Sequence, residues 1–307
     1  MESKTSFNEL LKQVSANMTG SVKFVNQYTK DKNGRPYTKV NAANFIQILE
    51  GKQMWECMPS SQKNIIHGLL LTQNSKSFDE LIKAADQIKE AAQGFLQRWL
   101  FENDTPQYTL TVGNYEGILQ GVQEWDELST EERKAIHALL TYHQGESYPI
   151  LYERAMHVKK ETESFINSYL MDQDGSLCTQ VDKDHYKKIL EGEAVWQKKS
   201  PLIKAAIDQR MNQPHYLELL NGALMLLDTC KRFIEDYLSS VESDLYEEVN
   251  EENMHQILQG AEVWKRMTEN QKMIINETLM LHDRKLFEDM LDDARTIQYE
   301  RKLERSR

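Results

Sequence analysis

The chain has 307 residues, of which 40% are hydrophobic and 28% charged, a balance typical of a protein that buries a core. Its formal net charge of -11 argues against nucleic acid as a partner, because affinity for phosphates comes largely from clustered lysine and arginine. Only 13 glycines and 6 prolines occur, while residues that favour helices recur throughout. We therefore expect an all-α protein.

The N-terminal segment MESKTSFNELLKQV has no basic start followed by an apolar run and no small-residue cleavage pattern. No stretch of the sequence approaches the apolar length of a membrane span, so we expect no membrane insertion. A piece of a longer secreted protein would look the same. The location therefore stays open between the cell surface or exterior and the cytoplasm.

One eight-residue motif occurs four times, with offsets of 70, 71 and 68 residues between copies. Chance does not supply such agreement, so the chain is predicted to be a tandem array. We expect repeat unit 1 at 1–75, unit 2 at 76–145, unit 3 at 146–213 and unit 4, with a C-terminal capping helix, at 214–307. The copies are ILEGKQMW (48–55), ILQGVQEW (118–125), ILEGEAVW (189–196) and ILQGAEVW (257–264).

The first predicted helix of each unit carries two aromatic residues four positions apart, which places them on one helix face. The phenylalanine lies 26 or 27 residues before the motif glycine in every unit. The pairs are Phe24 with Tyr28, Phe95 with Trp99, Phe165 with Tyr169, and Phe233 with Tyr237.

A turn is predicted after this helix in two units, because Asn33-Gly34 and Asp174-Gly175 are strong turn signals that fit a short hairpin. The same segments invite comparison with a calcium-binding loop. Placing each glycine at the sixth loop position puts Val40 and Val181 at the twelfth, where a bidentate glutamate is needed. We therefore do not expect calcium to bind.

The second predicted helix carries the motif, and segments 181–184 and 250–253 have the composition of its N-cap in units 3 and 4. Glycine inside a helix costs about 1 kcal/mol relative to alanine, so four copies imply a steric requirement, for which we expect close helix contact. The tryptophan four residues later shares that face and is predicted to fill the core beside the glycine rather than to bind a ligand. The predicted structural core residues are Gly51, Trp55, Gly121, Trp125, Gly192, Trp196, Gly260 and Trp264.

The third predicted helix begins in unit 2 at Ser129, because the segment 129–132 has the form of a capping box. An isoleucine follows each motif tryptophan by eleven residues, and a further aromatic residue follows that. These positions are Ile66 and Phe78, Ile136 and Tyr148, Ile207 and Tyr216, and Ile275 and Phe287.

Apolar residues then step by four and three across each repeat boundary without a phase error, which predicts one continuous helix through each junction. We therefore expect four three-helix units fused through long shared helices into an elongated array. The stripes are Leu81, Ala85, Ile88, Ala92, Phe95 and Trp99; Leu151, Ala155, Val158, Thr162, Phe165 and Tyr169; and Leu219, Ala223, Leu226, Cys230, Phe233 and Tyr237.

The stripe degrades towards both ends of the chain. Asn17 and Ser21 interrupt it in the first long segment, and Arg301 and Glu304 interrupt it in the last. Polar ends are what a finite, capped array requires.

The sequence contains no familiar catalytic or cofactor signature, so we expect no enzymatic activity and no cofactor or metal. Cys57, Cys178 and Cys230 are far apart and fall at different repeat positions, which indicates free thiols. His67 and His137 share one repeat position, where the other units have different polar residues, so a partly exposed helix position explains both. An acidic run between 235 and 252 is interpreted as a solvated linker, with attraction of a basic partner as the alternative.

The unit, an aromatic pair, an Asp-Gly turn, a Y-x-x-I-L-x-G-x-x-x-W helix and a further amphipathic helix, resembles tandem three-helix repeats in surface proteins of gut Gram-positive bacteria. The similarity spans the whole chain and is clearest from Phe165 through Tyr186 to Trp196. The chain departs from that class in lacking an export signal and a wall-sorting tail, and in carrying three cysteines. The resemblance implies a surface or secreted module that binds a host protein, with immunoglobulin as one partner class.

The leading hypothesis is thus a non-enzymatic protein-binding scaffold, because stacked helical units let exposed positions vary over a constant core. The alternatives are a mechanical spacer or stalk and an intracellular helical adaptor. A helical enzyme ranks last. The partner-binding residues are not visible in the repeat, because the shared positions are core positions.

Overall fold

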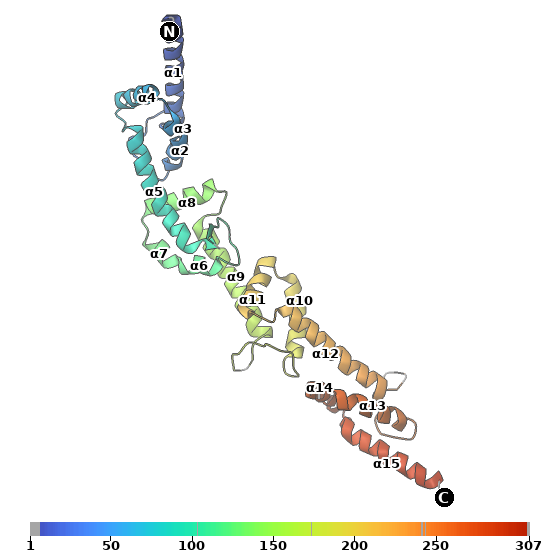
Figure 1. Ribbon diagram of the computed structural model, residues 1–307. Coiled ribbons are helices and arrows are strands. Elements are labelled where there is room, and N and C mark those ends of the chain that lie inside the picture. Colours follow the sequence, from blue (N-terminus) through green and yellow to red (C-terminus); the bar gives the residue numbers. More distant parts are fainter. Residues whose placement is uncertain (1–6, 103, 173, 241, 243, 306–307) are drawn as a thin grey trace. The chain divides into compact units, whose positions relative to one another are not determined.

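The chain is mostly helical in the computed structural model (Figure 1), as the composition predicts. The only strands among the described residues form one pair of two residues each. No helix in this part of the chain is long and apolar enough to cross a bilayer. The described residues are 7–102, 104–172, 174–240, 242 and 244–305.

The helices fall into two compact units, residues 1–158 and 159–307, called the first unit and the second unit to distinguish them from the predicted repeat units 1 to 4. In the first unit the dominant contacts are those of α2 with α5, α1 with α4, and α5 with α8. Its elements are α1 (Phe7–Tyr28), α2 (Phe45–Glu50), α3 (Lys52–Cys57), α4 (Ser60–Thr72), α5 (Phe78–Trp99), β1 (Phe101–Glu102), β2 (Thr105–Pro106), α6 (Tyr115–Gln120), α7 (Val122–Glu127), α8 (Thr130–Tyr142) and the start of α9 (Tyr148–Tyr169).

In the second unit α13 packs against α15, α10 against α12, and α12 against α14. The division into four repeat units and the elongated arrangement stay predictions. The elements that follow α9 are α10 (Tyr186–Lys198), α11 (Pro201–Met211), α12 (Tyr216–Tyr237), α13 (Met254–Arg266), α14 (Glu269–Leu281) and α15 (Phe287–Arg305).

The predicted continuous helices are confirmed, because α5, α9 and α12 are each a single helix of 22 residues. A capping box in which Ser77 and Glu80 satisfy each other's backbone N–H groups begins α5. The predicted capping box at Ser129 likewise begins α8. The prediction that segment 181–184 caps the second helix of repeat unit 3 is wrong, because this segment lies in the preceding turn and α10 begins at Tyr186 with His185 as its N-cap.

The predicted hairpins are also found, with antiparallel bridges between Lys30 and Pro36 and between Met171 and Leu177. The glycine of each turn has a positive φ, 77° at Gly34 and 85° at Gly175, which L-residues rarely adopt. The same connection recurs in the other two repeats, where no Asn-Gly or Asp-Gly pair marks the turn. There, β1 pairs with β2, and a bridge joins Ser239 to Leu245.

Three aromatic rings from three helices meet in each of four clusters. The first ring comes from the aromatic pair, the second is the motif tryptophan, and the third begins the next long helix. The first ring packs edge-on against the third ring in every cluster, an arrangement that the quadrupoles of aromatic rings favour. The first-to-third centroid distances are 4.8 Å for Phe24–Phe78 in the cluster of Trp55, 5.0 Å for Phe95–Tyr148 with Trp125, 5.0 Å for Phe165–Tyr216 with Trp196, and 5.0 Å for Phe233–Phe287 with Trp264.

The motif glycine lies against two of these helices, but the steric requirement comes from aromatic rings rather than from a close approach of helix backbones. A methyl group on Gly51 would lie 2.8 Å from Cγ of Tyr28 and 3.0 Å from Cζ of Phe78. Gly121, Gly192 and Gly260 face the equivalent pairs of aromatic residues at 2.7 to 3.3 Å. Only hydrogen leaves room for both rings.

The expectation of polar ends is wrong for the N-terminal helix. Asn17 is half-buried and Ser21 is fully buried, and the first half of α1 exposes large apolar side chains instead of polar ones. Phe7, for example, is 73% exposed. Asn17 and Ser21 therefore do not mark a polar end, because exposed apolar residues precede them in α1.

We predict opposite effects for two glycine-to-alanine substitutions. Gly51→Ala should destabilise the protein by about 1–2 kcal/mol, because the new methyl group meets the near end of the Tyr28 side chain, which cannot move aside without shifting α1. Gly68→Ala in α4 meets no atom within 4 Å and should stabilise the helix by up to about 1 kcal/mol. Urea unfolding followed by circular dichroism measures both, and equal shifts of the two midpoints would contradict the packing argument.

Candidate functional site

In each of the four repeats, the connection between the first helix and the motif helix ends in a polar turn. In three of them an asparagine at one repeat position is buried and holds the turn. Its side-chain oxygen accepts a hydrogen bond from the backbone N–H three residues earlier, and its side-chain NH2 group donates to the backbone carbonyl five residues earlier. These bonds measure 2.8 and 3.0 Å at Asn44, 2.9 and 2.9 Å at Asn114, and 2.9 and 2.8 Å at Asn253.

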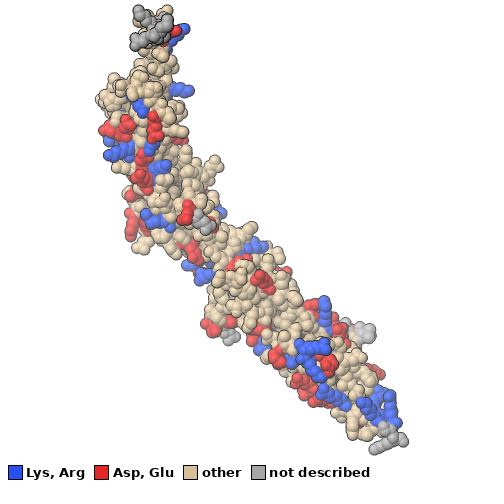
Figure 2. Space-filling model, in the orientation of Figure 1, with Lys and Arg blue, Asp and Glu red and all other residues tan. Residues whose placement is uncertain are grey.

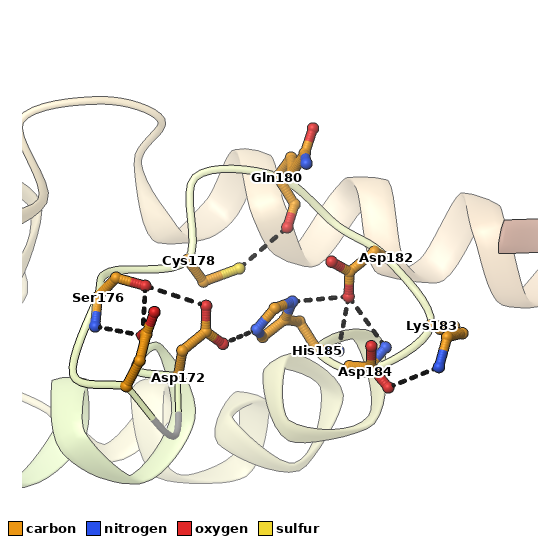
Figure 3. Close-up of polar contacts among 9 residues, drawn as sticks. Asp172, Ser176, Cys178, Gln180, Asp182, Lys183, Asp184 and His185 are labelled. Atoms are coloured by element: carbon orange, nitrogen blue, oxygen red, sulfur yellow. Dashed lines mark hydrogen bonds and ion pairs between the residues drawn. The ribbon is translucent and has the colours of Figure 1, made fainter.

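His185 stands at this position in the remaining connection, and the turn is built differently (Figure 3). The Oδ1 atom of Asp182 accepts from the His185 backbone N–H at 3.0 Å and lies 2.6 Å from its Nδ1. The other ring nitrogen contacts the carboxylate of Asp172. The imidazole, whose side chain is 15% exposed, thus lies between two carboxylates.

The substitution also changes the carbonyl that the asparagine would have bound. Counting five residues back from His185 gives Gln180, whose carbonyl accepts instead from the Cys178 thiol at 3.0 Å (Figure 3). Cys178 is 3% exposed, and burial raises the pKa of its thiol. We call His185, Asp172, Asp182, Cys178 and Gln180 the His185 cluster.

The geometry of the His185 cluster does not bring a nucleophile onto a base. The thiol points at a backbone carbonyl, and both ring nitrogens of His185 point at carboxylates. Among the described residues no group of three or more histidine, cysteine, aspartate or glutamate side chains is placed to hold a metal ion. The arrangement can hold a surface loop in one conformation, since the side chains of His185, Cys178 and the two aspartates all contact groups within the loop.

A solvent-open groove of about 820 Å³ lies in the first unit, between segment 39–42, α5 and α8. Its surface is mainly apolar and built largely from small side chains, with Ala84 and Ala91 seven residues apart on one face of α5. The other apolar or small lining residues are Val40, Ala42, Ile88, Ala92, Gly94, Phe95, Leu128, Ala135 and Ile136.

Most charged groups on the rim of this groove already have partners. Arg98 forms an ion pair with Glu124, Glu132 caps α8 through Ser129, and Glu131 lies 3.0 Å from a lysine one turn along its helix. The Arg98 side chain lowers the pKa of Glu124. A small polar ligand would therefore find few uncommitted groups, whereas the apolar floor remains open.

The predicted core tryptophans occupy the aromatic clusters, with Trp55, Trp196 and Trp264 at most 5% exposed and Trp125 half-buried. The indole N–H of Trp55 donates to Asp79 at 2.8 Å, and that of Trp264 to Glu288 at 3.2 Å. These acids follow the third ring where it is phenylalanine.

Tyrosine takes the third position in the other two clusters, and its hydroxyl makes the polar contact instead. Tyr148 donates to the Ile118 carbonyl at 2.6 Å and Tyr216 to the Ile189 carbonyl at 2.8 Å. Burial raises the pKa of both phenols far above the ordinary value. Each cluster therefore satisfies one buried polar group, by one of two routes.

The remaining polar positions behave as ordinary surface features. His67 and His137 are exposed on their helices, and at the same repeat position Asp208 and Asn276 accept the first backbone N–H of the next long helix, each at 3.2 Å. Within the acidic run, Glu247 lies 3.4 Å from an arginine at 284. Acidic and basic side chains are interspersed on the face seen in Figure 2.

Sequence reasoning missed both the groove and the His185 cluster. Aligning the four motifs would have shown His185 against three asparagines, a signal that was present in the sequence but not used. Comparison with known protein families, curated proteins and solved structures found no match to this chain.

The three thiols should react at very different rates. Cys57 is exposed, whereas Cys178 and Cys230 are buried, and burial raises the pKa of Cys230 to about 11. A thiol with a raised pKa stays protonated and unreactive below that pH. At pH 8 we expect one equivalent of a chromogenic disulfide reagent to react quickly and three in denaturant. Cys57→Ser should remove the fast phase, and two or more fast equivalents in the native protein would contradict the burial.

Substitutions at His185 should show whether the turn depends on the imidazole itself or only on a side chain that can hold the loop. His185→Asn introduces the residue that holds the turn in the other three connections, so the free energy of unfolding should change by less than about 0.5 kcal/mol. His185→Ala removes both side-chain contacts and should cost about 1–2 kcal/mol. Urea midpoints and amide exchange at residues 184 and 185 measure the difference, and equal losses in the two variants would show that the asparagine turn cannot form there.

Proposed function

We propose that this chain is a non-enzymatic helical-repeat scaffold that binds another protein. It is built from four three-helix repeat units, and consecutive units share a long helix. The constancy of the aromatic clusters supports this reading, since the interior is the same four times over while the loops and helix surfaces differ from unit to unit. Repeat proteins use that separation of core from surface to present extended binding faces.

The groove beside α5 is the observation that carries the proposal. Its apolar floor of small side chains suits an amphipathic helix, which lays one apolar face into a groove. The lining is net negative even though Arg98 pairs with Glu124, because its charged residues are Glu90, Glu124, Glu131 and Glu132 against Lys39 and Arg98. We therefore assign the groove to a partner helix whose polar edges carry lysine or arginine.

The resemblance to repeats of bacterial surface proteins supports an extracellular host protein as the source of that helix. Immunoglobulin is one candidate for that host protein, but it would use a different surface of the chain. Its domains are β-sandwiches, which offer no amphipathic helix, so it would bind exposed helix faces outside the groove.

A groove-filling variant tests the proposal. Immobilised wild-type chain, Ala91→Arg and Gln97→Arg are exposed in parallel to host serum and to purified immunoglobulin G. Ala91 is exposed on α5 and lines the groove, so arginine there fills it and opposes a basic partner without burying the new charge. Gln97 is exposed on α5 but is not part of the groove lining, and carries the same substitution as a matched control.

We expect wild type and Gln97→Arg to retain the same serum protein, and Ala91→Arg to bind it at least tenfold more weakly. Binding of that protein to wild type should weaken at high salt. Circular dichroism should be unchanged in both variants. Equal retention by all three would refute the groove as the binding site, and immunoglobulin binding that survives Ala91→Arg would assign that partner to another face.

A further inference from the structure

The first half of α1 presents an apolar stripe that no part of the described chain covers. Phe7 is 73% exposed, Leu10 48%, Leu11 51% and Val14 62%. Their spacing of three, one and three residues places them on one helix face. A stripe of this size on a helix surface normally has a packing partner.

The same stripe is buried where it recurs in α5. Phe7 lies 71 residues before Phe78, and the segment SFNELLKQV beginning at residue 6 aligns with SFDELIKAA beginning at residue 77. In α5 the aligned side chains of Phe78, Leu81, Ile82 and Ala85 are at most 9% exposed. They are buried because the first half of α5 packs against α2 and closes the cluster of Phe24 and Trp55.

Phe7 thus has the position of a third ring without a cluster to close. The rings that hold this position elsewhere all lie within 5.1 Å of a motif tryptophan and within 5.0 Å of a phenylalanine from the preceding long helix. We propose that the first half of α1 is the docking face for one more repeat body of this type, joined directly to α1. That body would supply a Phe–Trp–Gly half-cluster that Phe7 completes.

A second copy of this chain fits the face less well. All four half-clusters of the described chain already hold their own third ring, at Phe78, Tyr148, Tyr216 and Phe287, so none is open to Phe7 of another molecule. The far half of α15 offers no further half-cluster either. It has Glu304 seventeen residues after Phe287, where α5 has Phe95 seventeen residues after Phe78.

The experiment supplies the missing body from the chain's own sequence. A second copy of residues 7–77 is inserted directly before Phe7 of the full chain, so that the original Phe7 follows a serine, as Phe78 does in the native sequence. Hydrogen exchange at residues 8–18 of the original helix should slow at least tenfold relative to the native chain. Phe7→Ala at the original position should lower the Tm of the extended chain as much as Phe78→Ala does, yet leave the Tm of the native chain unchanged.

Two results would overturn the proposal. One is an unchanged rate of hydrogen exchange at residues 8–18. This result counts against the proposal whether or not circular dichroism shows that the added body folds, because in both cases the body has not packed against the exposed face of α1. The other is a dimer of the native chain by sedimentation at micromolar concentration that Phe7→Asp converts to monomer, since a second copy would then be the occupant. Neither result depends on whether the groove beside α5 binds a partner.

Discussion

The packing of two aromatic side chains over one helix face is the interaction on which the rest of the fold depends. At the motif glycine the face has no side chain, and the rings of the neighbouring long helices meet there at van der Waals distance or closer to a hypothetical methyl group. Glycine is unfavourable inside a helix by about 1 kcal/mol, so its presence in all four motifs reflects the larger gain from burying these rings. Each buried aromatic side chain removes 150 Å² or more of surface from water, on the order of several kcal/mol.

The same interaction explains why the junction helices cannot break. In α5, Phe78 closes the cluster of Trp55, while Phe95, seventeen residues later, begins the cluster of Trp125. A helix keeps two residues at that separation in fixed register only if its hydrogen bonding is uninterrupted. Tyr216 and Phe233 in α12 stand in the same relation. A local kink would therefore weaken two clusters together, which couples neighbouring cores within a unit.

Much of the fold followed from the sequence, because the residues that build it repeat. The junction helices and the capping box at Ser129 could be predicted from periodicity and cap chemistry, which are local. The steric partner of the glycine could not, because the distance from Gly51 to the Tyr28 and Phe78 rings depends on how three helices meet. The exposed face of α1 was missed for a different reason. Phe7 and Leu10 have the spacing of core residues, and only the structure shows that no described part of the chain covers them.

The groove and the His185 cluster illustrate why a repeated core says little about binding. Asn44, Asn114 and Asn253 hold equivalent turns, so their position reads as structural, yet His185 preserves the turn with different chemistry and leaves two carboxylates beside an imidazole. Likewise the α5 positions that line the groove as Ala84 and Ala91 are free to differ in the other long helices, because they contribute nothing to the aromatic clusters. Positions that the packing leaves unconstrained are the ones available for recognition. Specificity in such an array therefore has to be sought where the units disagree, and Ala91, which is exposed on α5 and takes no part in the aromatic clusters, is one such position.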